Sequence, residues 1–230
     1  MSALSEFASL LTAGALMVSA AVNTAAPQHD INGTLFLCNR DYRITEAYIP
    51  ETVDSHVYGS VRSLRPDAAS ALKEMFDACK QETGVSLQSV SGYRSYRTQE
   101  HIWRRKLRSV KGKKEKAQEY VAPPGSSEHQ LGLAMDIGQR SGSSLNASFA
   151  RTKGGKWLAA NAWRFGFILR YDRQWEAVTG YRYEPWHFRY VGKTYAKEIF
   201  DSGLPLETWL VMHRTELLTG LFTDERKSQK

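Results

Sequence analysis

The sequence predicts an α+β domain rather than a regular alternation of strands and helices. Short apolar or alternating runs typical of strands are interspersed with amphipathic helical stretches of unequal length. The chain has 230 residues, of which 42% are hydrophobic, which suffices for one domain with a sizeable core. Its 24% of charged residues is typical of soluble globular proteins.

The first half of the chain contains a sequence of elements separated by clear breaks. Residues 34–39 form a short apolar run, which predicts a strand, and residues 49–61 are expected to be irregular. A helix should begin at Pro66 and end at Gly84, because apolar residues recur between them at three- and four-residue spacings. A strand over 85–90 and a basic amphipathic helix over 96–116 should follow.

The second half begins with a break at the Pro-Pro-Gly sequence of residues 123–125. Short apolar runs predict strands, and longer periodic stretches predict helices. In order, we expect a strand over 134–137, a Gly/Ser loop over 138–144, a helix over 156–165, strands over 167–171 and 188–191, and a helix over 194–217 interrupted at 203–205.

The N-terminal 30 residues differ from the rest of the chain. Residues 7–22 are apolar and small residues follow at 24–26, which indicates an export signal or membrane anchor with a linker over 1–30. However, the first basic residue is Arg40, whereas a secretory signal begins with a positive segment, so an ordinary N-terminal helix stays open. The folded domain is expected over 31–217 and a polar tail over 218–230.

The chain is basic, with a net charge of +7 and a pI of about 9.4. Basic residues are dispersed apart from a run at residues 111–116, and no nucleic-acid-binding motif accompanies that run. A solvated helix face or loop is therefore the preferred interpretation, and nucleic acid is not an expected partner.

The two cysteines, Cys38 and Cys79, allow two interpretations. In an exported protein they could form a disulfide, and in their apolar surroundings they could equally be free core residues. Neither belongs to a CxxC motif, so a thiolate metal site is not expected.

The candidate chemistry lies in two histidine-containing clusters. In SEHQLGLAMD, residues 127–136, His129 should come from a loop and Asp136 from the strand that follows it. Gly132 and Ala134 are small enough to let the backbone approach a ligand. A catalytic zinc site needs three protein ligands and one open position, and His and carboxylate side chains supply most such ligands.

The second cluster, EPWH, places Glu184 three residues before His187. In a regular strand these positions point to opposite faces, so a turn at Pro185 is needed for both to approach one metal. A lone histidine is more often a core or surface residue than a ligand. The two clusters together indicate a metal site with Glu184 as a base.

Four segments resemble a known family in its order and spacing. They are SxHxxGxAxD over 127–136, EPWHFRYVG over 184–192, SGYRS over 91–95 with Gln99, and GFILRY over 166–171. From about residue 34 to 211 the chain is similar to the VanY-type D-alanyl-D-alanine carboxypeptidases. Hedgehog domains share that fold and zinc site, but EPWHFRYVG favours the bacterial peptidases. The resemblance implies a small antiparallel sheet flanked by helices, with 31–217 as a zinc peptidase domain.

The resemblance also implies a role for individual residues. One zinc ion per chain would be held by His129, Asp136 and His187, with Glu184 as the catalytic base. Arg94 would stabilise the oxyanion, Ser127 would contact the terminal carboxylate of the substrate, and Gln99 and Tyr93 would lie on the substrate side. Trp186 is expected to pack the wall of the site, whereas Tyr171 and Tyr183 are undecided between core and cleft.

The implied activity is zinc-dependent removal of the C-terminal D-alanine from peptidoglycan stem peptides. An L,D-carboxypeptidase, a D,D-dipeptidase and an endopeptidase on stem peptides stay open, as does a zinc-bearing cell-wall binding module without catalysis. The export-like N-terminus argues against a cytoplasmic dipeptidase and for action at the bacterial cell envelope, secreted or membrane-anchored. We expect a monomer.

Overall fold

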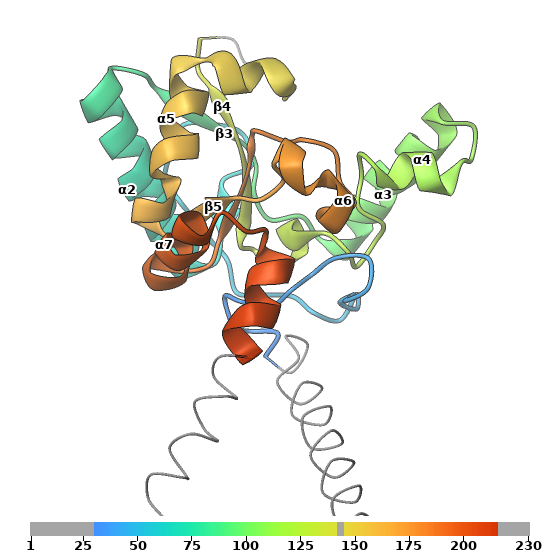
Figure 1. Cartoon of the computed structure of the whole chain (residues 1–230). Helices are drawn as coiled ribbons and strands as arrows, with labels where there is room; N and C mark the ends of the chain where they lie inside the picture. Colours follow the sequence, from blue (N-terminus) through green and yellow to red (C-terminus); the bar gives the residue numbers. More distant parts are fainter. Residues whose placement is uncertain (1–29, 142–144, 216–230) are drawn as a thin grey trace, which may run out of the picture. The chain divides into compact units, whose positions relative to one another are not determined.

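The computed structural model describes residues 30–141 and 145–215, coloured in Figure 1. It divides into two compact units. The larger unit spans Leu37–Glu207 and contains every residue of the predicted site. Described residues 30–36 and 208–215 belong to the second unit, and the domain boundaries 31–217 stay a prediction.

The larger unit is built on a four-stranded antiparallel sheet. Its strands are β3 (Leu87–Ser91), β4 (Ala134–Gln139), β5 (Phe167–Leu169) and β6 (His187–Tyr190), in the spatial order β3-β4-β6-β5. Two further short strands, β1 (Val53–Asp54) and β2 (Ser63–Leu64), form a separate antiparallel ladder, and β1 lies in the region 49–61 that was expected to be irregular. The α+β class and the small antiparallel sheet are thereby confirmed.

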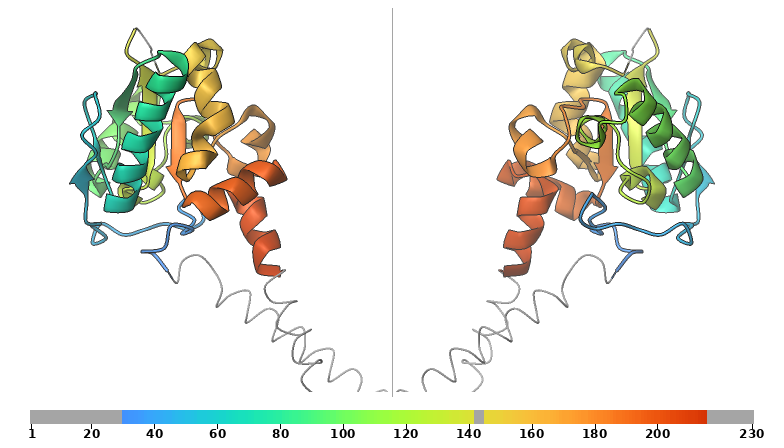
Figure 2. Two further views of the ribbon diagram at one scale, coloured as in Figure 1. Left: turned by 90° about the vertical axis from the view of Figure 1, so that its left-hand side faces the viewer. Right: turned by 90° about the vertical axis from the view of Figure 1, so that its right-hand side faces the viewer.

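Helices cover one face of this sheet. Figures 1 and 2 show α2 (Pro66–Thr83), α5 (Lys153–Asn161) and α7 (Lys193–Ser202) on the same side of the strands. The predicted bounds of α2 are confirmed, because Pro66 occupies its first turn and Gly84 caps its end with a left-handed φ of 75°. Its apolar residues, among them Leu72 and Met75, are buried against the sheet layer.

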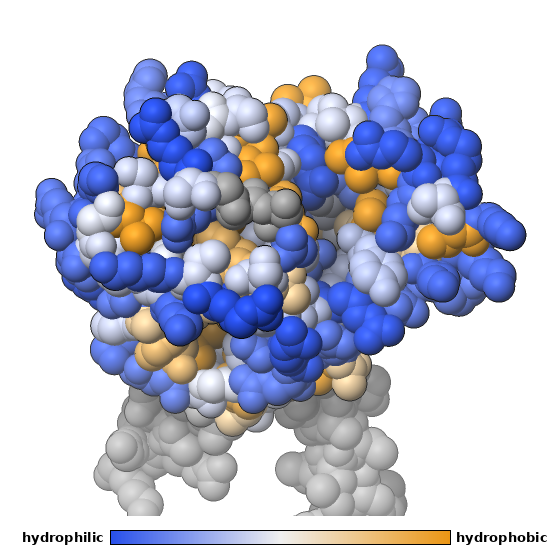
Figure 3. Space-filling view, turned by 90° about the horizontal axis from the view of Figure 1, so that it is seen from above, coloured by the Kyte–Doolittle hydropathy of each residue, from blue (hydrophilic) through white to orange (hydrophobic). Residues whose placement is uncertain are grey.

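The basic helix expected over 96–116 is two helices, α3 (Tyr96–Ser109) and α4 (Lys114–Gln118). The chain turns between them because Lys111 and Gly112 adopt left-handed φ values of 54° and 77°, which no α-helix accommodates. The side chains of the basic run are exposed, as predicted for a solvated face. Figure 3 shows hydrophilic residues over most of the face seen from above, on the side of α3 and α4 as well.

The strand predicted over 34–39 is wrong. Within the larger unit, Leu37 and Cys38 are buried as their apolar character requires. However, the Asn39 N–H donates to the carbonyl of Tyr42, and the Asn39 side chain accepts from two further backbone N–H groups. This local turn satisfies the backbone without a sheet neighbour.

The remaining predicted elements are present with shifted bounds. The helix expected over 156–165 begins earlier, because the Thr152 side chain caps it, and it ends as a 3₁₀ turn. The interruption expected at 203–205 is confirmed by Gly203, which ends α7 at a φ of 65°. Other short elements are η2 (Glu128–Leu131), η3 (Ala147–Arg151), η4 (Ala162–Phe165), η5 (Arg173–Trp175) and α6 (Glu176–Thr179).

Cys38 and Cys79 are free thiols, and both are buried. Of the two interpretations of the cysteines, the core one is therefore confirmed. Cys38 donates to the carbonyl of Gly125, which ties the chain before the site to the segment that carries His129.

None of the helices in the described part of the chain combines the length and the apolar character that a membrane crossing needs. Residues 1–29 of the predicted export signal or anchor, residues 142–144 of the predicted loop and the predicted tail over 218–230 lie outside the described residues.

Candidate metal centre

Three side chains of the larger unit converge on one point. His129, Asp136 and His187 are buried and present ligand atoms that all lie within 4.8 Å of one another. Asp136 Oδ1 is 3.1 Å from Nδ1 of His187, and Asp136 Oδ2 is 3.4 Å from Nε2 of His129. The three predicted ligands are therefore brought together.

The sheet positions two of these residues. Asp136 on β4 is the direct cross-strand partner of His187 on β6, so both side chains point to the same face. Met135 and Ile137, their neighbours on β4, point to the opposite face and are fully buried. The strand thus separates a polar site on one face from the core on the other.

His129 comes from the 3₁₀ turn η2 and is oriented by β3. A register shift between Ser89 and Ser91 marks a bulge in β3, next to which the carbonyl of Gly92 lies 2.7 Å from Nδ1 of His129. That contact assigns the ring proton to Nδ1 and leaves Nε2 toward Asp136. A Cβ on Gly92 would come within 2.6 Å of the Ser63 carbonyl, so only glycine fits this approach.

The role expected for Gly132 is corrected. It adopts a left-handed φ of 69° and ends η2, and a Cβ there would meet Arg65 and Thr52 rather than the metal cluster. Gly132 therefore shapes the turn that carries His129 rather than making room for a ligand.

Glu184 faces the cluster from the predicted turn. The His187 N–H donates to the Glu184 carbonyl at 3.1 Å, so the segment between them reverses at Pro185 and both side chains reach one side. Glu184 Oε2 lies 3.9 Å from Nδ1 of His187. Burial raises the pKa of Glu184 to about 7, although His187 opposes the shift, and such a carboxyl can both take up and release a proton near neutral pH.

The two histidines of the cluster differ in their affinity for protons. Burial, with Arg94 nearby, lowers the pKa of His129 to about 4, so its ring is neutral. Burial also disfavours protonation of His187, but its hydrogen bonds to Asp136 and Glu128 outweigh this and raise its pKa to about 9. Asp136 stays ionised because both histidines lower its pKa more than burial raises it.

A narrow pocket of about 60 Å³ opens onto the cluster. Four of the predicted site residues line it beside the two histidines, namely Arg94, Gln99, Ser127 and Glu184. The Nε of Arg94 and the Oε1 of Gln99 are buried without a hydrogen-bond partner, which leaves them available to a ligand. The backbone N–H of Arg94 donates to the carbonyl of His129 and fixes this arginine beside the metal cluster.

The structure does not bring Tyr93 to this pocket. Its backbone N–H donates to the Ser63 carbonyl, and its side chain is not among the lining residues. Tyr171, which the sequence left undecided, lines the pocket with its ring 4.8 Å from that of His187. Tyr183 and Trp186 do not line it.

Sequence reasoning missed Glu128, Tyr120 and Tyr181. The two tyrosines come from segments outside the motifs and complete the pocket wall. Glu128 is fully buried and lies between His187 and the guanidinium groups of Arg170 and Arg189. Glu128 lies between Ser127 and His129, two residues of the predicted site. A buried carboxylate is costly without partners, so this position could have indicated that Glu128 has charged partners near the site.

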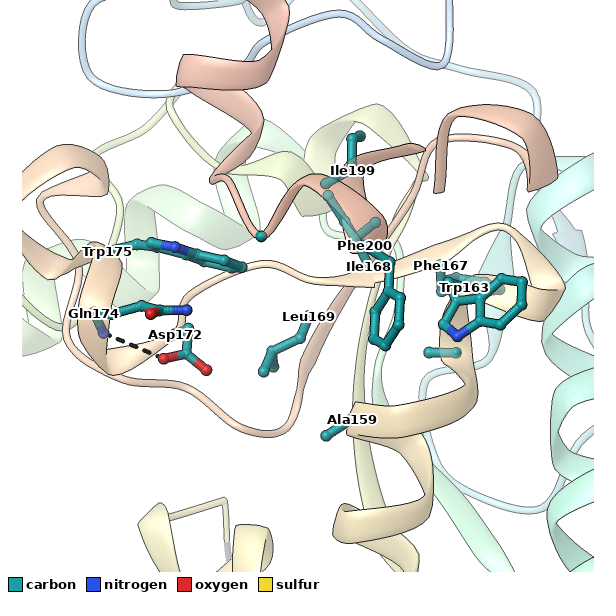
Figure 4. A pocket seen from close by; sticks show the side chains of 12 residues that line it. Ala159, Trp163, Phe167, Ile168, Leu169, Asp172, Gln174, Trp175, Ile199 and Phe200 are labelled. Atoms are coloured by element: carbon teal, nitrogen blue, oxygen red, sulfur yellow. Dashed lines mark hydrogen bonds between the residues drawn. The ribbon is translucent and has the colours of Figure 1, made fainter. Parts of the chain in front are cut away.

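A second pocket, of about 230 Å³, lies at the β5 edge of the sheet (Figure 4). Figure 4 shows Trp175, Gln174 and Asp172 on one side of it and Phe200 with Trp163 on the other, with Leu169 between them. Its lining is mainly apolar and includes none of the predicted site residues, so we place the chemistry at the metal cluster.

The residues of the cluster fit a zinc ion. Two imidazole nitrogens and a carboxylate oxygen form the donor set of catalytic zinc sites that retain an open position. In addition, Nε2 of His129 is buried with no hydrogen-bond partner, as expected of a nitrogen directed at a metal.

An antiparallel sheet that presents this donor set beside a carboxyl with a raised pKa is the arrangement expected of a zinc peptidase. The chain belongs to the VanY family, described as D-alanyl-D-alanine carboxypeptidase, and the family match covers residues 61–193. The family that the motifs indicated is therefore confirmed.

Individual relatives agree with this assignment. The putative carboxypeptidase YodJ of Bacillus subtilis (strain 168) is 54% identical over 149 residues, which are 64% of this chain and 54% of YodJ. A D-alanyl-D-alanine carboxypeptidase of Enterococcus faecalis is 41% identical over 60% of this chain and 52% of its own length. The chain thus spans about half the length of these curated relatives.

Solved structures are similar over most of the chain. The LD-carboxypeptidase LdcB matches with a TM-score of 0.74 and 48% identity, covering 78% of this chain and 86% of LdcB. The D,D-pentapeptidase VanY of a VanB-type cassette, solved as a mutant with Zn(II), matches with a TM-score of 0.66 and 36% identity over 77% and 98%. VanYB in complex with D-Ala-D-Ala gives a TM-score of 0.66 and 35% identity over 77% and 97%.

Proposed function

We propose that the chain is a zinc-dependent carboxypeptidase that removes the C-terminal D-alanine from peptidoglycan stem peptides. The observation that carries this proposal is the buried cluster of His129, Asp136 and His187, with Glu184 facing it and a pocket opening onto it. The related VanYB, solved with D-Ala-D-Ala, supports the substrate class.

The side chains have complementary tasks in this hydrolysis. His129, Asp136 and His187 would hold a zinc ion, which would supply Lewis-acid chemistry to the scissile carbonyl and to the attacking water. Glu184 removes a proton from the attacking water through its carboxylate and later delivers that proton to the leaving amine. In the metal-free site burial raises the pKa of Glu184 to about 7, and a bound zinc ion would favour the carboxylate form that accepts the proton of the water.

Two polar side chains of the pocket handle negative charge on the substrate. Arg94 is fixed beside His129 and faces Glu184 and Asp136, so its guanidinium stabilises the charge that develops on the carbonyl oxygen. Ser127, buried in the same wall, offers a hydroxyl to the terminal carboxylate. Gln99, held by its bond to the Ala122 carbonyl, keeps Oε1 free for a substrate N–H.

An L,D-carboxypeptidase is the second candidate, because LdcB is 48% identical whereas the VanY structure is 36% identical. Mass spectrometry of defined pentapeptide and tetrapeptide muropeptides, incubated with the zinc-loaded protein, separates the two activities. Loss of one alanine from the pentapeptide supports the proposal, and loss from the tetrapeptide alone supports L,D activity. Loss from neither, with binding to cell wall that EDTA does not reverse, would favour a binding module.

Action on peptidoglycan places the protein outside the cytoplasm, either secreted or anchored through residues 1–30. Localising the full chain and a version lacking those residues in a bacterial host tests this. Retention of the full chain in the cytoplasm would contradict it.

A further inference from the structure

Glu128 precedes one histidine of the metal cluster in the chain, yet its side chain contacts the other. Its Oε2 lies 3.3 Å from Nε2 of His187, whereas Nδ1 of the same ring lies 3.1 Å from Asp136. The two nitrogens of His187 therefore face in different directions, one toward the cluster and one toward a buried carboxylate.

The second oxygen of Glu128 is occupied by two arginines. Arg170 Nε and Arg189 Nη1 donate to Oε1 at 2.8 and 3.0 Å, and all three side chains are at most 1% exposed. A carboxylate that receives two guanidinium donors is held ionised and can only accept hydrogen bonds. The hydrogen between Glu128 Oε2 and His187 Nε2 must therefore belong to the histidine.

We propose that Glu128 is a positioning residue that keeps a proton on Nε2 of His187 and thereby directs the unprotonated Nδ1 to the metal. This rests on the zinc site of the proposed function and deepens it. A histidine that binds a metal commonly donates its other ring N–H to a carboxylate, which fixes its tautomer and ring orientation. Among the described residues, Glu128 is the carboxylate that lies within hydrogen-bonding distance of Nε2 of His187.

The proposal accounts for two arginines within the sequence motifs. Arg170 in GFILRY and Arg189 in HFRY are fully buried and do not line the substrate pocket, so they do not bind substrate directly. Arg170 also binds Glu207, with Nη1 2.9 Å from Oε2. Two carboxylates thus balance two guanidinium groups, which makes burial of the four charges tolerable.

The test replaces Glu128 by glutamine, which keeps the shape of the side chain and removes its charge. We expect Glu128→Gln to bind zinc about 10- to 100-fold more weakly in a chelator competition, a typical effect for such outer partners. Glu128→Asp keeps the charge and should restore part of the affinity. The matched control is Glu207→Gln, which removes the other acidic partner of Arg170 without contacting His187.

Glu207→Gln should lower the melting temperature and leave zinc affinity unchanged, whereas a purely structural role of Glu128 would make both variants alike. Nitrogen-15 spectra of the zinc-loaded wild-type protein add a readout that needs no variant to fold. They should show His187 protonated at Nε2 and bound to metal through Nδ1.

Metal bound through Nε2, or wild-type zinc affinity in Glu128→Gln, would overturn the proposal. Both readouts are independent of peptide hydrolysis. A failure of D-alanine release would therefore count against the proposed activity and leave the tautomer assignment intact.

Discussion

Asp136 and His187 are paired across two adjacent strands, with Oδ1 of the first 3.1 Å from Nδ1 of the second. The backbone hydrogen bonds between β4 and β6 therefore hold two of the three metal ligands. Only His129 comes from a turn, and the Gly92 carbonyl fixes its ring. Most of the site geometry is set by the sheet rather than by mobile loops, which favours a preformed site.

Removing the carboxylate of the cluster should abolish zinc binding. We expect Asp136→Ala to contain far less than one zinc per chain by elemental analysis, because two imidazoles alone are an incomplete donor set. Asp172→Ala, which removes a carboxylate from the pocket at the β5 edge, serves as the control and should retain zinc. Full occupancy in Asp136→Ala would contradict the assigned ligands.

Replacing the base should separate catalysis from metal binding. We expect Glu184→Gln to reduce kcat by about 10²- to 10⁴-fold, the usual contribution of a positioned acid/base, while zinc content stays at the wild-type level. Glu198→Gln, an exposed position on α7, should be fully active. Persistent D-alanine release by Glu184→Gln at the wild-type rate would show that another group is the base.

The guanidinium beside the cluster should act on the transition state. Arg94→Ala should lower kcat by about 10²- to 10³-fold, as loss of one oxyanion donor does in comparable sites. The exposed Arg97, which pairs with Glu46 on the surface, provides a control, and Arg97→Ala should leave kcat unchanged. A change confined to KM in Arg94→Ala would assign this arginine to ground-state binding instead.

Zinc affinity should increase with pH. Hydrogen bonds raise the pKa of metal-free His187 to about 9, so at neutral pH a proton competes with the metal for this ring. As pH rises toward about 9 the competing proton is lost and apparent affinity grows, and below that value binding releases the proton. Chelator competition over this pH interval, with calorimetry in two buffers to count protons, measures both effects. A zinc affinity that does not change over this pH interval would show that metal-free His187 is not protonated at neutral pH.

The same group makes stability of the metal-free protein depend on pH in a defined direction. The folded pKa of His187, about 9, lies above its ordinary value of 6.5, so the folded state binds more protons between these values. Its contribution is fully present below 6.5 and is lost as pH rises through about 9. Urea unfolding of wild-type protein and His187→Gln in EDTA should therefore converge at alkaline pH.

The sequence predicted the residues of the metal cluster, because all three lie in short motifs that resemble those of a known family. The structure brings these three side chains together. The sequence also predicted α2, where proline and glycine mark both ends. Residues 34–39 were misassigned because burial alone does not distinguish a strand from an apolar turn. The break after α3 was not predicted, because a lysine rarely adopts a left-handed conformation and Lys111 does so here.

The partners of the ligands were harder to predict than the ligands. Glu128 is next to His129 in the chain, but its side chain contacts the ring of His187. The spacing of the motif does not indicate this contact with the other histidine. Tyr120 and Tyr181 reach the pocket from segments whose sequences show no periodic or motif signal. Such contacts depend on tertiary packing, which sequence patterns do not encode locally.

The bulge in β3 and the pairing of β4 with β6 fix a particular alignment of strands. If β4 slipped by one residue, Asp136 would turn into the apolar layer and Met135 or Ile137 would face the histidines. A chain misaligned in this way could neither take up metal nor bury its core. Metal binding therefore requires the correct strand alignment. A molecule with misaligned strands would bind no zinc and would not hydrolyse peptides.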